Sequence, residues 1–320
     1  MTGPGPLEVT VPIALEGERV DRVVAFLTDL SRAAAAALVA SGAVEVDGRP
    51  ETRRSTPLRA GSTILVRDVT PHVHSVEPDP SVPLDVVFDD DDLIVVNKRW
   101  DVVVHPGAGR SGGTLVNGLL ARYAELAALV GDGLSEPARP GIVHRLDRGT
   151  SGLLVVARSP RALLSLRAQM AAHAADRRYA ALVHGHLAHD RGLIDAPIAR
   201  SARRPTQMAV SGRGREARTG YQVVERRETP VPSTLVTATL ETGRTHQVRV
   251  HFAAIGHPVV GDARYRGDRG RPVGLPPGRF FLHADRLSID HPASGERTTF
   301  SASLPSDLAV LLGEVPAWPA

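Results

Sequence analysis

The chain of 320 residues contains no cysteine, a single lysine and no long apolar run. The lack of cysteine excludes disulfide bonds, thiolate metal sites and a cysteine nucleophile. The N-terminus lacks the basic-then-apolar pattern of a secretory signal, and no segment approaches the roughly 20 apolar residues that a membrane helix needs. We therefore expect a soluble, cytoplasmic protein that does not associate with a membrane.

Charge is nearly balanced, and the formal net charge of +3 is a weak indication of nucleic-acid binding. Because Lys98 is the only lysine, nearly every cation is an arginine. Six arginines between Arg200 and Arg218 stand against one acid, Glu216, in a segment rich in serine, glycine and proline. This segment fits a flexible basic loop along a phosphate backbone or a solvated surface loop, and charge leaves both interpretations open.

The length of the chain and its 42% hydrophobic residues predict two domains, each with its own core. In the N-terminal part, apolar residues at helical spacing predict a helix over 19–30 and a second helix over 32–41. Val44 and Val46 alternate into Asp47-Gly48, a strong hairpin signal, and a further strand is expected over 62–67. We predict a small α+β module over residues 15–70.

Four prolines without helical periodicity predict an extended linker over residues 71–85. The remainder, residues 86–315, alternates many short apolar strands with few helices. The helices are expected over 114–130 and from Ser159-Pro160 onward, where serine is a good N-cap and proline suits the first helical position. Strands are expected over 86–88, 93–96, 153–157, 179–183, 221–225 and 234–240. We predict an α+β fold with a mixed, largely antiparallel sheet.

The segment GIVHRLDRGTSGLLVVARS, residues 141–159, carries the strongest chemical signal. Asp147 stands between Arg145 and Arg148, followed by a turn-rich run and an apolar strand. A carboxylate at the mouth of a strand, near guanidinium groups, is expected to stay ionised and nucleophilic. Asp147 is therefore a candidate catalytic carboxylate.

A second segment, residues 243–251, precedes Gly256 and Pro258. With Thr245 as the N-cap, it predicts a short helix over 246–255. On this helix Arg249 can pair with Asp147, or it can lie exposed and contact a phosphate. His246 and His251 do not share a helical face, so we expect no metal site there.

Together these segments resemble the RluA-type family of RNA pseudouridine synthases, and within it the large-subunit ribosomal RNA (RluD-like) members. The family signature H-R-L-D-x-x-T-S-G-L is matched by residues 144–153. Further matches are Asn97-Lys98, Val104-His105-Pro106-Gly107, Arg178-Tyr179-Ala180 and residues 243–251, so the resemblance covers roughly the whole chain. The chain departs from the family at Arg99-Trp100-Asp101, where a proline and a glycine are usual, and at Arg177, where a lysine is usual.

The resemblance implies that Asp147 is the essential catalytic residue, with Tyr179 and Arg249 as further catalytic residues. The Tyr179 ring would stack on a uracil and its hydroxyl would take part in proton transfer, although its apolar surroundings alone favour a core tyrosine. The N-terminal part resembles the alpha-L RNA-binding module. The residues then expected to bind RNA are Arg145, Arg244, His246, Arg22 and Arg32, with Arg145 holding or replacing an extruded nucleotide.

The expected function is isomerisation of uridine to pseudouridine in RNA, with large-subunit ribosomal RNA or a ribosomal precursor as the substrate. This isomerase would need no cofactor and no metal. One alternative is a catalytically silent RNA-binding ribosome assembly factor. Another is a hydrolase of nucleoside bonds, which usually needs a second carboxylate to activate water. The sequence offers no obvious second carboxylate near Asp147.

Overall fold

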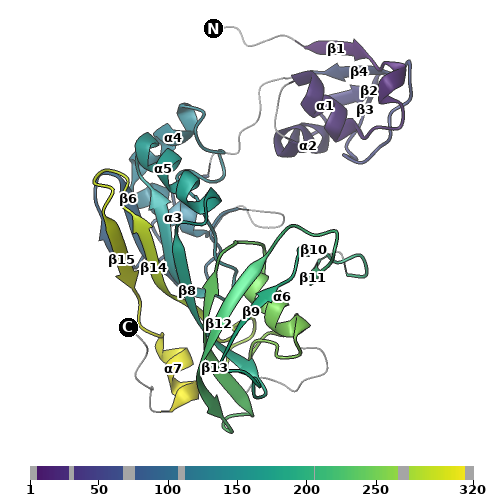
Figure 1. The fold of residues 1–320 in the computed structure, drawn as a ribbon. Helices are drawn as coiled ribbons and strands as arrows, with labels where there is room; N and C mark the ends of the chain where they lie inside the picture. The colour runs from purple at the N-terminus through teal and green to yellow at the C-terminus, as the bar shows by residue number, and fades with distance from the viewer. Residues whose placement is uncertain are drawn as a thin grey trace. The chain divides into compact units, whose positions relative to one another are not determined.

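The computed structural model describes residues 6–28, 32–67, 76–106, 112–204, 206–265 and 274–313. The chain divides into two compact units, residues 1–75 and residues 76–320 (Figure 1). Within the described ranges, no helix is long and apolar enough to cross a membrane.

The N-terminal unit combines two helices with a small antiparallel sheet of order β1-β4-β2-β3. Its elements are β1 (Leu7–Thr10), a 3-10 turn (Ile13–Leu15), α1 (Val20–Thr28), α2 (Arg32–Ala40), β2 (Val44–Val46), β3 (Arg49–Pro50) and β4 (Thr63–Val66). Asp47 and Gly48 both have positive φ angles, 52° and 75°, so the predicted hairpin is confirmed. The sequence pattern did not predict β1, because alternation over four residues is too short to stand out.

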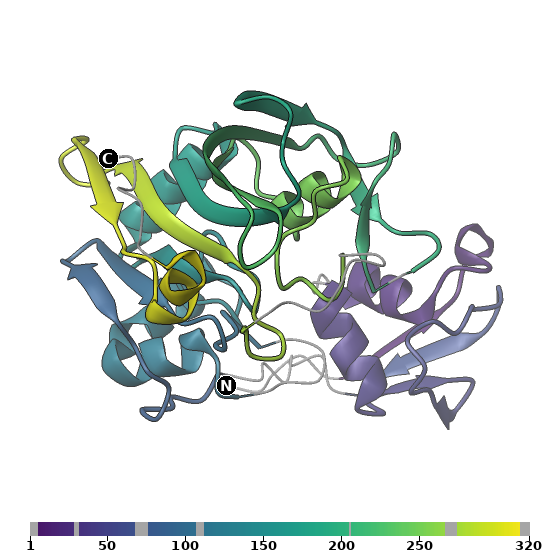
Figure 2. The ribbon, with the colours of Figure 1, turned by 90° about the horizontal axis from the view of Figure 1, so that it is seen from below.

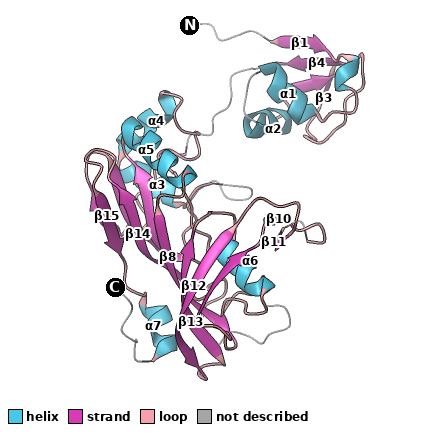
Figure 3. Ribbon diagram, in the orientation of Figure 1, coloured by secondary structure: helices cyan, strands magenta, loops and turns pink. Residues whose placement is uncertain are grey.

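The larger unit is built on a nine-stranded sheet, coloured magenta in Figure 3. Its order is β5-β6-β7-β14-β8-β13-β12-β9, and β15 pairs with β14. Among these neighbours the pair β7 and β14 is parallel and every other pair is antiparallel, which confirms the predicted mixed, largely antiparallel α+β fold. The strands are β5 (Val86–Asp89), β6 (Leu93–Lys98), β7 (Ser151–Ala157), β8 (Asp176–His184), β9 (Arg191–Asp195), β12 (Arg218–Arg227), β13 (Ser233–Leu240), β14 (Leu282–Asp290) and β15 (Arg297–Ser301).

The helices of this unit are α3 (Leu115–Arg122), a 3-10 segment (Ala124–Ala127), α4 (Ala128–Gly131), α5 (Pro160–Ala171), α6 (Gln247–Ala254) and α7 (Ser306–Leu312). The single helix predicted over 114–130 is wrong, because it is interrupted at Tyr123, whose ψ of 71° is not helical. At this interruption the hydroxyl of Tyr123 donates a hydrogen bond to the Asp89 carboxylate at 2.9 Å. The predicted start of α5 is confirmed, since the Ser159 side chain accepts from the Ala162 amide ahead of Pro160.

In strands β6 and β7 both faces of the sheet are buried, and side chains alternate between two cores. From β6, Ile94 and Val96 pack into the core that contains residues of α3 and α6, whereas Leu93 and Val95 pack into the core that contains residues of α5. Figure 2 shows α6 within the curve of the green strands. The first of these faces carries the candidate site.

Two segments that the sequence predicted as a loop and a linker, residues 200–218 and 76–85, are partly ordered into the larger unit. Residues 200–218 contain part of a hairpin formed by β10 (Ile198–Arg200) and β11 (Met208–Val210), and Arg218 pairs with Asp195 at 3.0 Å, so a wholly flexible loop is wrong. Residues 76–85, the second part of the expected linker, belong to the larger unit, and Val82 is buried in its core. Residues 71–75 lie outside the described residues.

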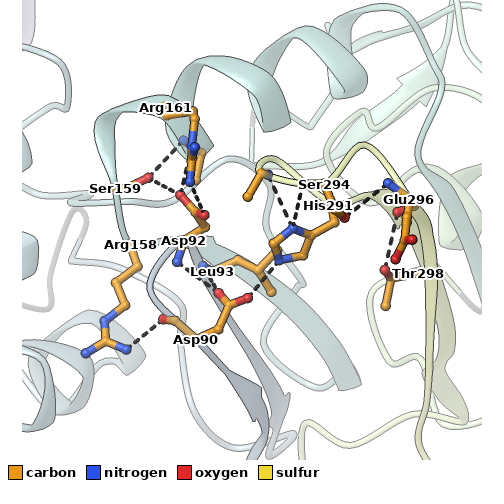
Figure 4. A network of polar contacts seen from close by, with 12 residues as sticks. Asp90, Asp92, Leu93, Arg158, Ser159, Arg161, His291, Ser294, Glu296 and Thr298 are labelled. Atoms are coloured by element: carbon orange, nitrogen blue, oxygen red, sulfur yellow. Dashed lines mark hydrogen bonds and ion pairs between the residues drawn. The ribbon is translucent and has the colours of Figure 1, made fainter.

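The acidic run at residues 89–92 fixes the turn between β5 and β6 (Figure 4). Asp92 is buried and accepts hydrogen bonds from Arg161 at 2.5 Å and from Ser159 at 2.7 Å, both at the start of α5. Asp90 lies 2.7 Å from Nε2 of His291, which follows β14. These contacts tie the turn to two elements that are distant in the sequence.

Candidate active site

Residues 147–150 form a tight turn, here called the Asp147 turn, which leads into the fully buried β7. The Thr150 amide donates to the Asp147 carbonyl at 3.1 Å, and the Gly149 amide donates to the Trp100 carbonyl at 2.7 Å. Gly149 has a φ of 94°, and a Cβ there would lie 2.4 Å from the Phe280 ring. The turn therefore requires glycine at this position, for its backbone angle as well as for space.

The Asp147 side chain is 14% exposed and meets a cation from α6. Nη1 of Arg249 lies 3.1 Å from Oδ2 of Asp147, so the predicted contact is present. The helix itself is confirmed, but its N-cap is His246, with a left-handed φ of 58°, rather than Thr245. The two arginines beside Asp147 in the sequence, Arg145 and Arg148, are exposed.

Arg249 is held on several sides. Asp262 accepts from its Nε at 2.6 Å and from its Nη2 at 3.0 Å, and the Asp262 side chain is 1% exposed. The guanidinium also lies over the rings of Phe280, at 4.3 Å, and Tyr265, at 5.1 Å. Burial lowers the pKa of Arg249, but Asp262 and Asp147 outweigh it and raise the pKa above its ordinary value. The result is a fixed, permanently charged partner for Asp147.

His246 is a second neighbour of the carboxylate. Its Nε2 lies 4.0 Å from Oδ1 of Asp147, and its Nδ1 lies 2.7 Å from the Tyr265 hydroxyl. Burial lowers the pKa of His246, although the charge of Asp147 acts in the opposite direction. The imidazole is therefore neutral at pH 7.

Tyr179, on β8, is 6% exposed and lines the same cavity as Asp147. Burial raises the pKa of its hydroxyl to about 12; the charge of Arg177 lowers it, and the charges of Asp147 and Asp285 raise it further. The phenol therefore keeps its proton at neutral pH. Arg177 and Tyr179 are two residues apart on the strand, so both face the cavity.

Lys98 has a role that the sequence did not reveal. It is 2% exposed, and its Nζ donates to the carbonyls of Arg99, at 2.6 Å, and Val102, at 2.8 Å. Burial lowers the pKa of Lys98 to about 7, while the charge of Asp147 raises it. Both carbonyls belong to the loop that supplies the Trp100 carbonyl to the Asp147 turn, which is the loop where the proline and glycine expected from the resemblance are missing.

The cavity beside Asp147 has a volume of about 580 Å³. Asp147 is the one carboxylic acid among its described lining residues, which include six arginines. They are Arg139, Arg145, Arg177, Arg215, Arg244 and Arg249. An electropositive cavity with a single acid suits a phosphate-bearing ligand and does not provide the paired carboxylates of a hydrolase.

The residues expected to bind RNA fall into three groups. Arg145, Arg244 and His246 line the cavity, and Nε of Arg244 donates to the Glu216 carbonyl at 2.8 Å. Arg22 is exposed on α1 of the N-terminal unit and pairs with Glu18 at 2.9 Å. The side chain of Arg32 lies outside the described residues. Among the described residues, no group of three histidine or acidic side chains could hold a metal ion.

Sequence reasoning missed Asp262 and Phe280, which hold Arg249. A buried arginine needs a carboxylate partner, and this rule was the one available signal. It does not say which acid of the chain provides the partner, because the contact is made through the fold.

Comparisons with known proteins agree with one another. Residues 92–254 match the family model described as RNA pseudouridylate synthase. An uncharacterised RNA pseudouridine synthase of Bacillus subtilis is 39% identical over 96% of this chain and 97% of its own length. The ribosomal large subunit pseudouridine synthase D of Nitrosomonas europaea is 40% identical over 96% of this chain and 87% of its own length. The solved structure of human RNA pseudouridylate synthase domain containing 1 covers 73% of this chain and 89% of its own, with a TM-score of 0.57 and 32% identity.

Proposed function

Since the chain belongs to the RNA pseudouridylate synthase family and is therefore an isomerase that acts on RNA, we propose that Asp147 is its essential catalytic residue and that large-subunit ribosomal RNA is its substrate. The observation that carries the catalytic assignment is that Asp147 is the single carboxylate among the described residues that line the cavity, and that Arg249 holds it at 3.1 Å. The substrate assignment is supported by relatives named large subunit pseudouridine synthase D, such as that of Nitrosomonas europaea.

The reaction breaks the bond from ribose C1′ to uracil N1 and forms a bond from C1′ to C5 of the same ring. A proton leaves C5 and a proton is gained at N1, so the balance needs neither oxidant nor reductant. The enzyme must supply a carboxylate at the nucleotide and a cavity that retains the detached base. Asp147 supplies the first, and the cavity of about 580 Å³ supplies the second.

Tyr179 and Arg249 complete the catalytic group in this proposal. The Tyr179 ring, buried beside Asp147, stacks on the uracil, and its protonated hydroxyl is a hydrogen-bond donor. Arg249 orients the carboxylate through a contact that it makes while fixed by Asp262.

The remaining residues serve RNA binding in this proposal. Arg145, exposed at the cavity two residues before Asp147, holds the strand from which the uridine has been extruded. Arg244 and His246 contact the nucleotide from the start of α6. The N-terminal unit binds RNA as an alpha-L type module through Arg22 and Arg32. Arginine-phosphate contacts predict that the affinity for RNA falls steeply with salt.

The catalytic proposal is tested with Asp147→Asn and Asp147→Ala on a large-subunit ribosomal RNA transcript that carries tritium at C5 of its uridines. Both variants should lose at least about 100-fold in tritium release, because the carboxylate takes part in the bond changes. Asp190→Asn is the control, since Asp190 is exposed and pairs with Arg226 outside the cavity. Wild-type turnover in both Asp147 variants would reject the proposal.

The substrate is tested by mapping pseudouridine across all cellular RNA with and without the gene. We expect sites to be lost from large-subunit ribosomal RNA. Loss confined to another RNA would reject the substrate assignment. If no site is lost, the catalytically silent assembly factor becomes the better explanation.

A further inference from the structure

A buried arginine, Arg279, donates a hydrogen bond to the backbone of the Asp147 turn. Its side chain is fully buried, and Nη1 donates to the Gly149 carbonyl at 2.7 Å. Nη2 donates to Oγ of Ser151, the first residue of β7, at 3.0 Å. One guanidinium thus bonds to the turn and to the strand that follows it, while its position outside the cavity lining keeps it from contacting substrate.

Arg279 is in turn held by Asp307, in the first turn of α7. Nε of Arg279 lies 2.8 Å from Oδ2 of Asp307, and Nη2 lies 3.4 Å from Oδ1. The helix is fixed on the unit because Leu308 and Leu312 pack into a core with Phe281. This packing fixes the position of Asp307, which in turn orients the guanidinium of Arg279.

The next residue along the chain, Phe280, reaches the other half of the catalytic pair. Its ring lies 4.3 Å from the Arg249 guanidinium, and it would be 2.4 Å from a Cβ at Gly149. Two consecutive residues thus contact the turn that carries Asp147 and the cation that pairs with it. A displacement of this dipeptide would change the relative position of the two charged groups.

We propose that Arg279 and Asp307 are positioning residues that set the Asp147 turn against Arg249, so that α7 controls catalytic geometry without touching RNA. The proposal rests on the catalytic role of Asp147 proposed above. Misplacement of a catalytic group by about 1 Å can cost about 100-fold in rate. A loss of the Asp307 carboxylate should therefore lower turnover while the affinity for RNA stays the same.

The test uses Asp307→Asn in the full chain, with turnover and KM measured on the tritiated large-subunit transcript. We expect kcat to fall by about 10- to 100-fold and KM to stay within about twofold. Asp92→Asn is the matched control, because Asp92 forms a similarly close pair with Arg161 away from the cavity. Both variants should lower the melting temperature, but Asp92→Asn should keep wild-type kcat.

A second variant, Arg279→Lys, covers the case in which Asp307→Asn does not fold. Lysine keeps the charge beside Asp307 but lacks the fork that spans Gly149 and Ser151, so kcat should again fall with KM unchanged. Wild-type kcat in either folded variant, or a change in KM alone, would overturn the positioning role. Asp147→Asn is assayed alongside: if it is active, the catalytic proposal fails, whereas an inactive Asp147→Asn with an active Asp307→Asn rejects the positioning role only.

Discussion

Replacing Asp262 with asparagine removes one of the two carboxylates that hold the buried Arg249. Breaking a buried ion pair by removing one partner costs about 3–5 kcal/mol, because the remaining charge loses its compensation. The asparagine side chain would keep an oxygen that can accept from the Arg264 and Tyr265 amides, which Oδ1 of Asp262 now binds at 2.9 Å and 3.3 Å. We therefore expect a loss near the lower limit, about 3 kcal/mol of unfolding free energy.

A folded domain has a stability of about 5–15 kcal/mol, so the variant should remain folded at 25 °C and its activity can be measured. Arg249 would then keep its contacts with Asp147 and with the Phe280 and Tyr265 rings but would lose both hydrogen bonds that fix its other side, so turnover should fall at least about 10-fold. Urea unfolding gives the stability, and tritium release gives the turnover.

Asp190→Asn provides the comparison, since its pair with Arg226 joins side chains that are 78% and 35% exposed. Exposed pairs contribute about 0–1 kcal/mol, so this variant should unfold almost as the wild type does. If Asp262→Asn loses less than about 1 kcal/mol and keeps wild-type turnover, the reasoning about the buried pair is refuted.

Two further predictions concern the strand after the Asp147 turn and the histidines His144 and His283. Gly152 has a φ of 114°, and a Cβ there would lie 2.2 Å from the Ala284 carbonyl oxygen, so Gly152→Ala should cost more than about 3 kcal/mol. Gly112→Ala should not destabilise the protein, because there is open space around Gly112. Equal melting temperatures for the two variants would contradict the predicted effect of Gly152→Ala. Burial lowers the pKa of His144 to about 3 and that of His283 to about 4. As the pH falls below 6.5, both histidines take up a proton in the unfolded chain but stay neutral in the folded protein. The free energy of unfolding is therefore highest above pH 6.5 and decreases as the pH falls toward 4. Each histidine should give the unfolding free energy a slope of up to about 1.4 kcal/mol per pH unit in that range, and a flat profile would count against it.

The sequence predicted the features that depend on neighbouring residues. The Asp47-Gly48 hairpin, the Ser159-Pro160 helix start and the buried strand after Asp147 were all found, because backbone angles and capping are decided within a few residues. Tyr123 is the exception, since its contact with Asp89 on β5 interrupts a helix that local pattern alone would continue.

The partners of Asp147 show where local reasoning ends. Its sequence neighbours Arg145 and Arg148 are exposed, and the cation that contacts it comes from α6, 102 residues later. Arg249 was predicted through the family resemblance and the helix pattern together. Asp262 and Asp307 were not predicted, because their contacts with Arg249 and Arg279 depend on how the chain packs and cannot be recognised from residue spacing or composition.

The strand order has a consequence for biosynthesis. Within the sheet, β14 is the strand that joins β7 to β8, and it comes late in the chain, at Leu282–Asp290. Asp147 lies on one side of this junction, and Tyr179 lies on the other. A ribosome that has already translated both residues has not yet made the strand that brings them together, so a nascent chain that stops short of β14 should be inactive although every proposed catalytic residue is present.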